Sequence, residues 1–147
     1  MNIRNAQTHA PLLAPRNAIA TQWTAAGIAR NVLAVLIGTA IVALAAQIAI
    51  PFKPVPITMQ TLAVVLVGWR LGAGRSFASL AVYGTLGSIG APIFAAGSSG
   101  AGASAGFIVG FVLAAAFVGW MASRKPLAGW RAVAVFGAGL AIPYVPG

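Results

Sequence analysis

Side chains that could carry covalent or metal chemistry are almost absent from this sequence. Its 147 residues include no cysteine, aspartate or glutamate, and the single histidine is His9, in a polar N-terminal stretch. General acid–base catalysis, zinc–thiolate binding and carboxylate-based metal binding all need residues from that missing set. We therefore predict no enzyme activity, no catalytic residue, no metal site and no cofactor. A carrier or a binding protein fits the residues that remain.

The remaining polar side chains interrupt apolar segments, where a binding protein would use them. Thr58 and Gln60 follow Pro56 closely, Tyr83 lies within a later apolar run, and Gln47 lies near the end of the first run. Thr58 and Gln60 face different directions in a helix but share a face in extended backbone. A phenol or a carboxamide in lipid needs a partner, because the surrounding hydrocarbon offers none. These groups are candidates for ligand contact or for hydrogen bonds within the protein.

The composition is that of an integral membrane protein. Hydrophobic residues make up 60% of the chain, charged residues only 6%, and the mean hydropathy is +0.94. A soluble domain carries roughly 25% charged residues, because its surface faces water. Most of this surface must therefore face another medium, and we predict that the medium is the lipid bilayer.

The charge balance also favours a membrane protein over a nucleic-acid-binding protein. Nine lysines and arginines stand against no acidic residue, and the pI is near 12.0. A basic protein that binds nucleic acid gathers its cations into a stripe or cluster. Here they stand singly or in pairs at the edges of apolar runs, as in membrane proteins. We predict no nucleic-acid partner.

Five apolar segments predict an all-α bundle of about five membrane spans. They lie at residues 32–50, 54–69, 76–89, 104–122 and 132–142, separated by charges, prolines or glycine-rich stretches. Before them, residues 1–31 read as a polar cytoplasmic tail, so that residues 32–147 form the transmembrane helical domain. With the N-terminus in the cytoplasm, eight of the nine basic residues fall inside and only Lys53 falls outside, as the positive-inside rule demands. The C-terminus would then lie outside.

Three ordered motifs resemble the BioY family, the biotin-binding membrane (S) component of energy-coupling factor transporters. They are PVPITMQTLAVVLVGWRLGAGRS at Pro54–Ser76, AVYGTLGSIGAPIFAAG at Ala81–Gly97, and AGFIVGF at Ala105–Phe111. The resemblance implies a six-helix fold with a biotin pocket near the outer face, closed by the loops after the first and third helices. It also implies partnership with energising transmembrane and ATPase subunits, in the inner or plasma membrane of a prokaryote.

The sequence departs from the family pattern in three places. The third loop reads Gly97-Ser98-Ser99-Gly100, without the basic residue usual there, and Gly102–Phe107 reads GASAGF where the family has GPTGGY. The sequence also stops at Gly147, before the family's sixth helix, so we expect a chain truncated before its last helix. Two alternatives to biotin uptake therefore stay open. One is a small structural or assembly membrane protein, or an inactive fragment, and the other is a carrier for a different vitamin.

Biotin combines an anionic carboxylate, an apolar bicycle and a ureido group that donates and accepts hydrogen bonds. Thr58 and Gln60 are candidates for the ureido group, unless they satisfy backbone near the prolines. Tyr83 contacts either the ligand or another helix. Lys53 could attract the carboxylate or serve as an interfacial anchor. The aromatic rings at positions 94 and 107 could line the pocket around the bicycle, or they could pack against other helices without contacting a ligand. The predicted substrate-binding set is Lys53, Thr58, Gln60, Tyr83, Phe94 and Phe107.

Overall fold

A computed structural model describes residues 24–50, 57–100 and 105–146. The chain divides into two compact units, Met1–Val32 and Leu33–Gly147. In the first unit the described part is the beginning of helix α2, which runs from Ala25 to Gln47 and continues into the second unit. The helix thus begins before the apolar run predicted to start at residue 32. Near its start, the Gly27 amide donates to the Thr24 hydroxyl at 3.3 Å.

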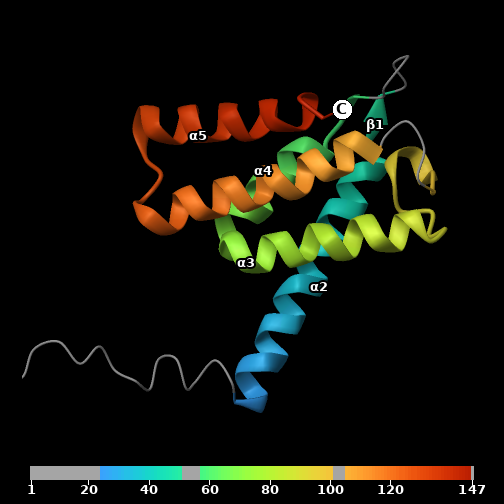
Figure 1. The fold of residues 1–147 in the computed structure, drawn as a ribbon, viewed down its shortest axis with the longest axis horizontal. Coiled ribbons are helices and arrows are strands. Elements are labelled where there is room, and N and C mark those ends of the chain that lie inside the picture. Colours follow the sequence, from blue (N-terminus) through green and yellow to red (C-terminus); the bar gives the residue numbers. More distant parts are fainter. Residues whose placement is uncertain (1–23, 51–56, 101–104, 147) are drawn as a thin grey trace, which may run out of the picture. The chain divides into compact units, whose positions relative to one another are not determined.

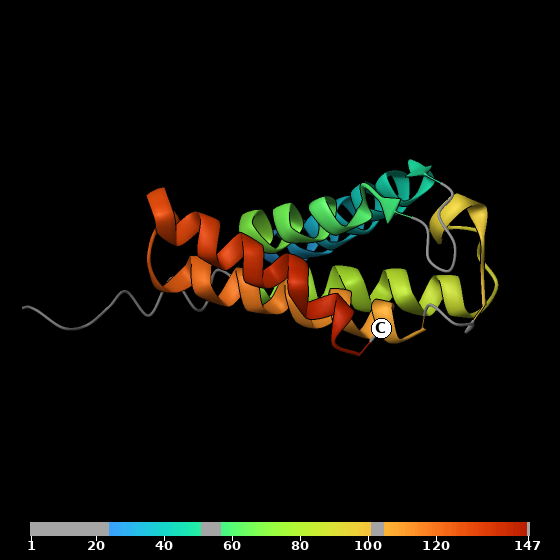
Figure 2. The same cartoon turned by 90° about the horizontal axis from the view of Figure 1, so that it is seen from above.

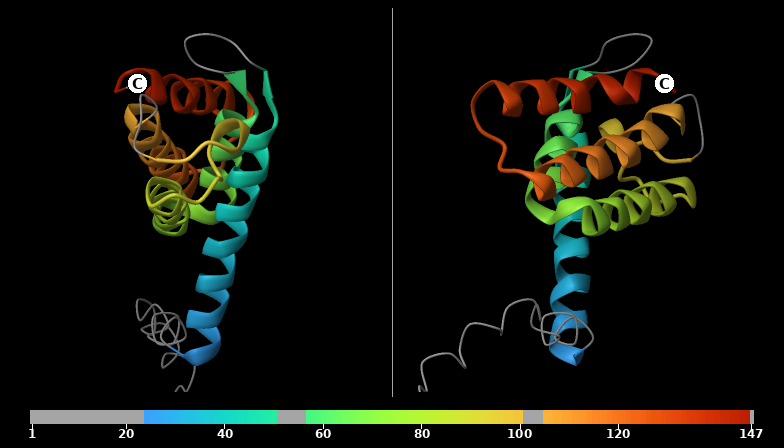
Figure 3. Two further views of the ribbon diagram at one scale, coloured as in Figure 1. Left: turned by 90° about the vertical axis from the view of Figure 1, so that its right-hand side faces the viewer. Right: turned by 60° about the vertical axis from the view of Figure 1, so that its left-hand side comes forward.

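The second unit is helical, as predicted. After α2 come α3 (Gln60–Ser88), α4 (Ala105–Arg124) and α5 (Gly129–Ala141), with short 3-10 turns η3 (Ala95–Gly97) and η4 (Ile142–Tyr144) (Figure 1). Helix α4 lies between α5 and the second part of α3 (Figures 1 and 3). Among the described helices, α2 and α4 are long and apolar enough to cross a membrane. The prediction of a helical fold is therefore confirmed, and two of its helices could span a membrane by length and composition.

Helix α3 contains two of the predicted apolar segments, joined by a sharp bend. Gly72 has φ 76° and ψ 170°, which are not helical values, so the helical geometry is interrupted there. A residue with a Cβ rarely adopts such a positive φ, whereas glycine does so readily. The two segments of α3 consequently run in different directions (Figure 2). This bend brings the beginning of α3 back towards its second segment.

A short strand pair lies between α2 and α3, and within the described ranges it is the only β structure. Strand β1 (Ala49–Ile50) pairs antiparallel with β2 (Ile57–Thr58), with Ala49 opposite Thr58. The Met59 amide extends the pairing by donating to the Ile48 carbonyl at 3.1 Å. The backbone is thus extended at residues 57–58, whereas Met59 already has helical angles and Gln60 begins α3. This strand pairing was not predicted.

Small and hydroxyl-bearing residues hold the helices of the second unit together. The Thr39 hydroxyl donates to the Ser79 carbonyl at 3.0 Å, and the Ser79 hydroxyl donates to the Val35 carbonyl at 3.1 Å. Between α3 and α4, the Ser76 hydroxyl donates to the Ala115 carbonyl at 3.1 Å. Lipid gives helices no hydrophobic reason to associate, so close packing and such hydrogen bonds take over that role.

Gly119 of α4 provides the first test of this packing. A Cβ added there would lie 2.5 Å from the Ala73 nitrogen and 2.6 Å from the Gly72 carbonyl carbon, and neither backbone atom can rotate away. We expect Gly119→Ala to destabilise the protein by about 1–3 kcal/mol through overpacking. Gly137→Ala is the control, because a Cβ at that α5 position meets nothing within 4 Å. Thermal unfolding in detergent measures both, and equal melting temperatures would contradict the packing described.

Candidate substrate-binding site

Three of the predicted site residues meet in the core of the second unit. Gln60 opens α3, Tyr83 lies in its second segment, and Phe94 lies in the loop that follows it. The three residues are 4%, 0% and 5% exposed, respectively. The Tyr83 and Phe94 ring centroids are 5.3 Å apart at 59°. The bend at Gly72 is what allows the first residue of α3 to approach a residue so much later in the same helix.

The polar atoms of this cluster are not all satisfied. The Tyr83 hydroxyl is buried and has no hydrogen-bond partner within the described residues. The Gln60 side chain is a polar neighbour that interacts with the phenol, but the two groups do not meet hydrogen-bond geometry. A buried polar group without a partner costs about 1–3 kcal/mol. A ligand that offered a hydrogen-bonding group at this point would recover that energy.

The loop after α3 closes over Tyr83 and is fixed by Gln47. The Gln47 amide nitrogen donates to the carbonyls of Ile93 at 3.3 Å and Phe94 at 3.2 Å, as well as to Ala43 in its own helix at 3.2 Å. Gln47 was expected to need a partner in the bundle, and the sequence could not name one. The structure identifies that partner as the backbone beside Phe94.

Gly87 makes room for the Phe94 ring. A Cβ at position 87 would overlap ring atoms of Phe94, so the ring lies directly against the backbone of α3. The Gly100 amide donates to the Gly87 carbonyl at 2.8 Å, which brings the far side of the loop to the same turn of helix. Gly87 and Gln47 together determine where Phe94 lies, and therefore whether Tyr83 is covered.

Two further predicted residues, Thr58 and Phe107, lie in neighbouring elements of the second unit. Thr58 is half-buried in β2, and Phe107 packs at the edge of the core with its ring 5.5 Å from that of Tyr144. Phe107 thus packs against the same hydrophobic core that contains Tyr83 and Phe94, while its ring pairs with that of Tyr144. Lys53 lies outside the described residues.

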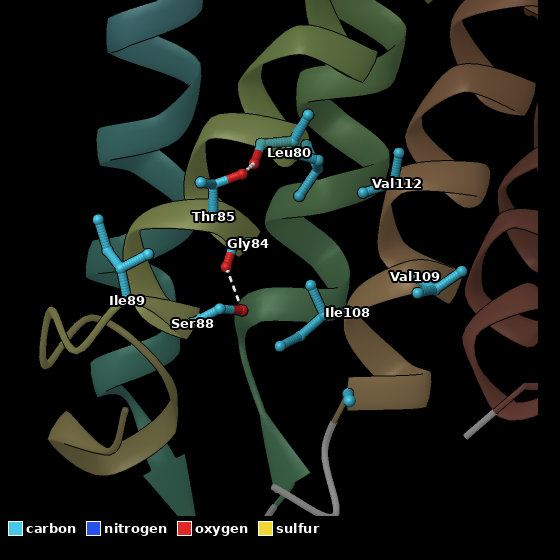
Figure 4. Close-up of a pocket in the computed structure, with 10 residues that line it drawn as sticks. Leu80, Gly84, Thr85, Ser88, Ile89, Ile108, Val109 and Val112 are labelled. Carbon is cyan, nitrogen blue, oxygen red and sulfur yellow. Dashed lines mark hydrogen bonds between the residues drawn. The ribbon is translucent and has the colours of Figure 1, made fainter. Parts of the chain in front are cut away.

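A separate groove runs between the second segment of α3 and the first half of α4 (Figure 4). Its volume is about 430 Å³, and it is lined mainly by apolar side chains, including Leu80, Ile108 and Val112. The Thr85 and Ser88 hydroxyls on its wall donate to carbonyls of their own helix at 2.8 and 2.7 Å. Tyr83 and Gln60 do not line this groove. It suits an apolar group rather than a ureido group.

Comparison with known proteins agrees with this architecture. The structure resembles a crystal structure of the S-component for biotin from an ECF-type ABC transporter, with a TM-score of 0.70 and 21% identity, over 82% of this chain and 70% of that one. The fold is thus that of a transporter S-component. The model of the BioY family matches residues 13–147. The chain belongs to the BioY family, which confirms the resemblance seen in the sequence.

Two curated relatives show the extent of the similarity. The chain is 36% identical over 122 residues to the biotin transporter BioY of Thermotoga maritima, covering 80% of this chain and 72% of that protein. It is 39% identical over 90 residues to the biotin transporter BioY2 of Lactococcus lactis subsp. cremoris, covering 58% of this chain. The match spans 50% of the Lactococcus protein's own length.

Proposed function

We propose that this protein is the substrate-binding membrane subunit of a biotin uptake system. The observation that carries the proposal is the buried cluster of Gln60, Tyr83 and Phe94. The proposal also rests on the family to which the chain belongs, whose named members are biotin transporters. An apolar ring beside a buried carboxamide and an unsatisfied buried hydroxyl matches a ligand that has both an apolar bicycle and a ureido group. In this proposal Gln60 and Tyr83 bind the ureido group, and Phe94 covers the bicycle.

Thr58 and Phe107 form the second part of the proposed site, and Lys53 provides its positive charge. Thr58 ends β2 two residues before Gln60, which begins α3, and we assign its hydroxyl to the same ligand group. In the proposed topology, Lys53 is the one outward-facing cation. A charge-assisted hydrogen bond contributes about 1.5–3 kcal/mol, which makes Lys53 the natural partner for the biotin carboxylate.

Biotin binding to the purified protein tests the proposal directly. We expect saturable binding of radiolabelled biotin in detergent or nanodiscs, with competition by desthiobiotin, which keeps the ureido group. Thiamine, a vitamin without a ureido group, should not compete. Absence of binding, both for the chain alone and when it is expressed with energising subunits, would favour a structural role instead.

The proposed topology has about five crossings, with the N-terminus in the cytoplasm of a prokaryotic cell. Because the sequence contains no cysteine, single cysteines can report the side of the membrane without background. Ser99 and Lys125 are exposed and lie at opposite ends of α4 in the chain. We expect Ser99→Cys to react with an impermeant maleimide in intact cells, and Lys125→Cys to react only after permeabilisation. The reverse labelling pattern would overturn the topology.

The partners proposed for the cytoplasmic side are the energising transmembrane and ATPase subunits of an energy-coupling factor transporter. S-components bind substrate, whereas coupling to ATP requires other chains. Affinity purification after co-expression should recover those subunits with the tagged chain. Biotin accumulation in cells should then depend on ATPase activity, and accumulation that survives an inactive ATPase would contradict the proposed coupling.

A further inference from the structure

A second hollow lies at the end of the second unit opposite the Phe94 loop. It has a volume of about 440 Å³ and lies where the bend of α3 meets the end of α4. Its lining is amphipathic, because it combines the polar residues Arg70 and Ser123 with apolar groups. The apolar members include Trp69, Leu71 and Leu127. The hollow shares no lining residue with the groove in Figure 4.

The cations near this hollow have no acidic side chain to pair with anywhere in the protein. The sequence holds nine lysines and arginines and no aspartate or glutamate. Arg124 and Lys125 stand in the chain between Ser123 and Pro126, which both line the hollow. The missing counter-charge therefore has to come from another molecule.

Two of the arginines here make closer contacts within the protein than Arg70 does. The Arg131 guanidinium donates to the carbonyls of Pro126 and Met121 at 3.3 and 3.4 Å, and Arg124 stacks 4.2 Å from the centre of the Trp120 ring. Arg70 lies 5.6 Å from the centre of the Trp69 ring and makes no hydrogen bond within the described ranges. It is exposed, and it lines the hollow, so its donors are available to an incoming anion.

The open backbone at the bend allows close approach. A Cβ added at Gly72 or Gly74 would meet nothing within 4 Å, so the bend is open in that direction, while Gly119 of α4 packs against the Gly72–Ala73 backbone. Indole rings such as those of Trp69 and Trp120 are typical of the boundary between lipid headgroups and hydrocarbon. A molecule that is anionic at one end and apolar at the other, and that resides at this depth, is a phospholipid.

We propose that this hollow binds the headgroup of an anionic phospholipid, with Arg70 bound to the phosphate. The glycerol and first acyl carbons then lie against Leu71 and Leu127, while Ser123 faces the headgroup. A guanidinium suits this role because it can form two parallel hydrogen bonds with a phosphate group. The site differs from general surface attraction, which would draw on all exposed cations alike.

Native mass spectrometry of the purified full chain, titrated with dioleoylphosphatidylglycerol or dioleoylphosphatidylcholine, tests the proposal. We expect one tight phosphatidylglycerol site and no equivalent phosphatidylcholine site. Arg70→Gln should weaken phosphatidylglycerol binding by about tenfold or more, as expected for loss of a charge-assisted contact. Arg75→Gln removes the same charge from a residue outside the lining and should have little effect.

Each other outcome of the titration contradicts the proposal. Equal losses in the two arginine variants would indicate diffuse attraction, and equal binding of both lipids would indicate an apolar site. Full displacement of lipid by millimolar inorganic phosphate would identify a free-phosphate site. Ser123→Phe gives an independent check, because it fills the hollow without removing charge and should also reduce phosphatidylglycerol binding. Unchanged lipid binding in that variant would place the lipid elsewhere.

Discussion

Replacing Gly87 with alanine should weaken biotin binding by about ten- to a hundredfold. The added methyl group would occupy the space of the Phe94 ring, which lies against the backbone of α3 at this position. Phe94 would have to leave its contact with Tyr83, and the loop beside it is already held by the Gln47 amide. Overpacking of this kind costs about 1–3 kcal/mol, and here it acts directly on the proposed cover of the site.

Gly74→Ala provides the matched control for Gly87→Ala. Both glycines lie in α3, but a Cβ at position 74 meets nothing within 4 Å. Equilibrium binding of radiolabelled biotin to both variants gives the comparison, with melting temperatures measured alongside. Normal affinity in the Gly87→Ala protein would show that Phe94 does not cover the ligand. Equal losses of biotin affinity in the two variants would show that α3 is sensitive to an added methyl group wherever it is placed.

The helical class was predictable because it depends on composition, whereas the bend in α3 depends on one backbone angle. Long uncharged runs must be helical in lipid, since helices satisfy their own backbone groups. The sequence separated the two segments at Arg70 and Arg75, and Gly72 between them was not singled out. Whether a glycine there ends a helix or bends it is decided by tertiary contacts, such as the close approach of Gly119 to Ala73.

The candidate site was predictable in its residue types but not in its arrangement. Gln60 and Tyr83 stood out because polar groups in lipid need partners. Nothing local indicated that Phe94 would lie on Tyr83 while Phe107 would lie on Tyr144, because both loop aromatics flank the same glycine-rich stretch. Gln47 was recognisable as a group in need of a partner. The position of Gly87 beneath Phe94 had no signal in the sequence, since small residues are common throughout such helices.

A single oxygen atom distinguishes a ligand-binding role for Tyr83 from a packing role. The hydroxyl is fully buried and has no hydrogen-bond partner among the described residues. Its burial therefore lowers the free energy of unfolding of the ligand-free protein by about 1–3 kcal/mol. Tyr83→Phe should therefore keep or raise the melting temperature of the ligand-free protein. The same change should weaken biotin binding by about 5- to 150-fold, because a buried polar group of the ligand would lose its partner.

The two effects of Tyr83→Phe have opposite signs, and that difference is the test. If the hydroxyl instead joined two helices, the variant would lose stability along with binding, and the proposed contact would be wrong. Tyr144→Phe is the control, since Tyr144 is exposed and its ring packs on Phe107 away from Tyr83. Both properties should remain unchanged in the control. Calorimetric biotin titrations and thermal unfolding of the same preparations would measure affinity and stability together, so that a fall in binding without a fall in stability assigns the Tyr83 hydroxyl to the ligand.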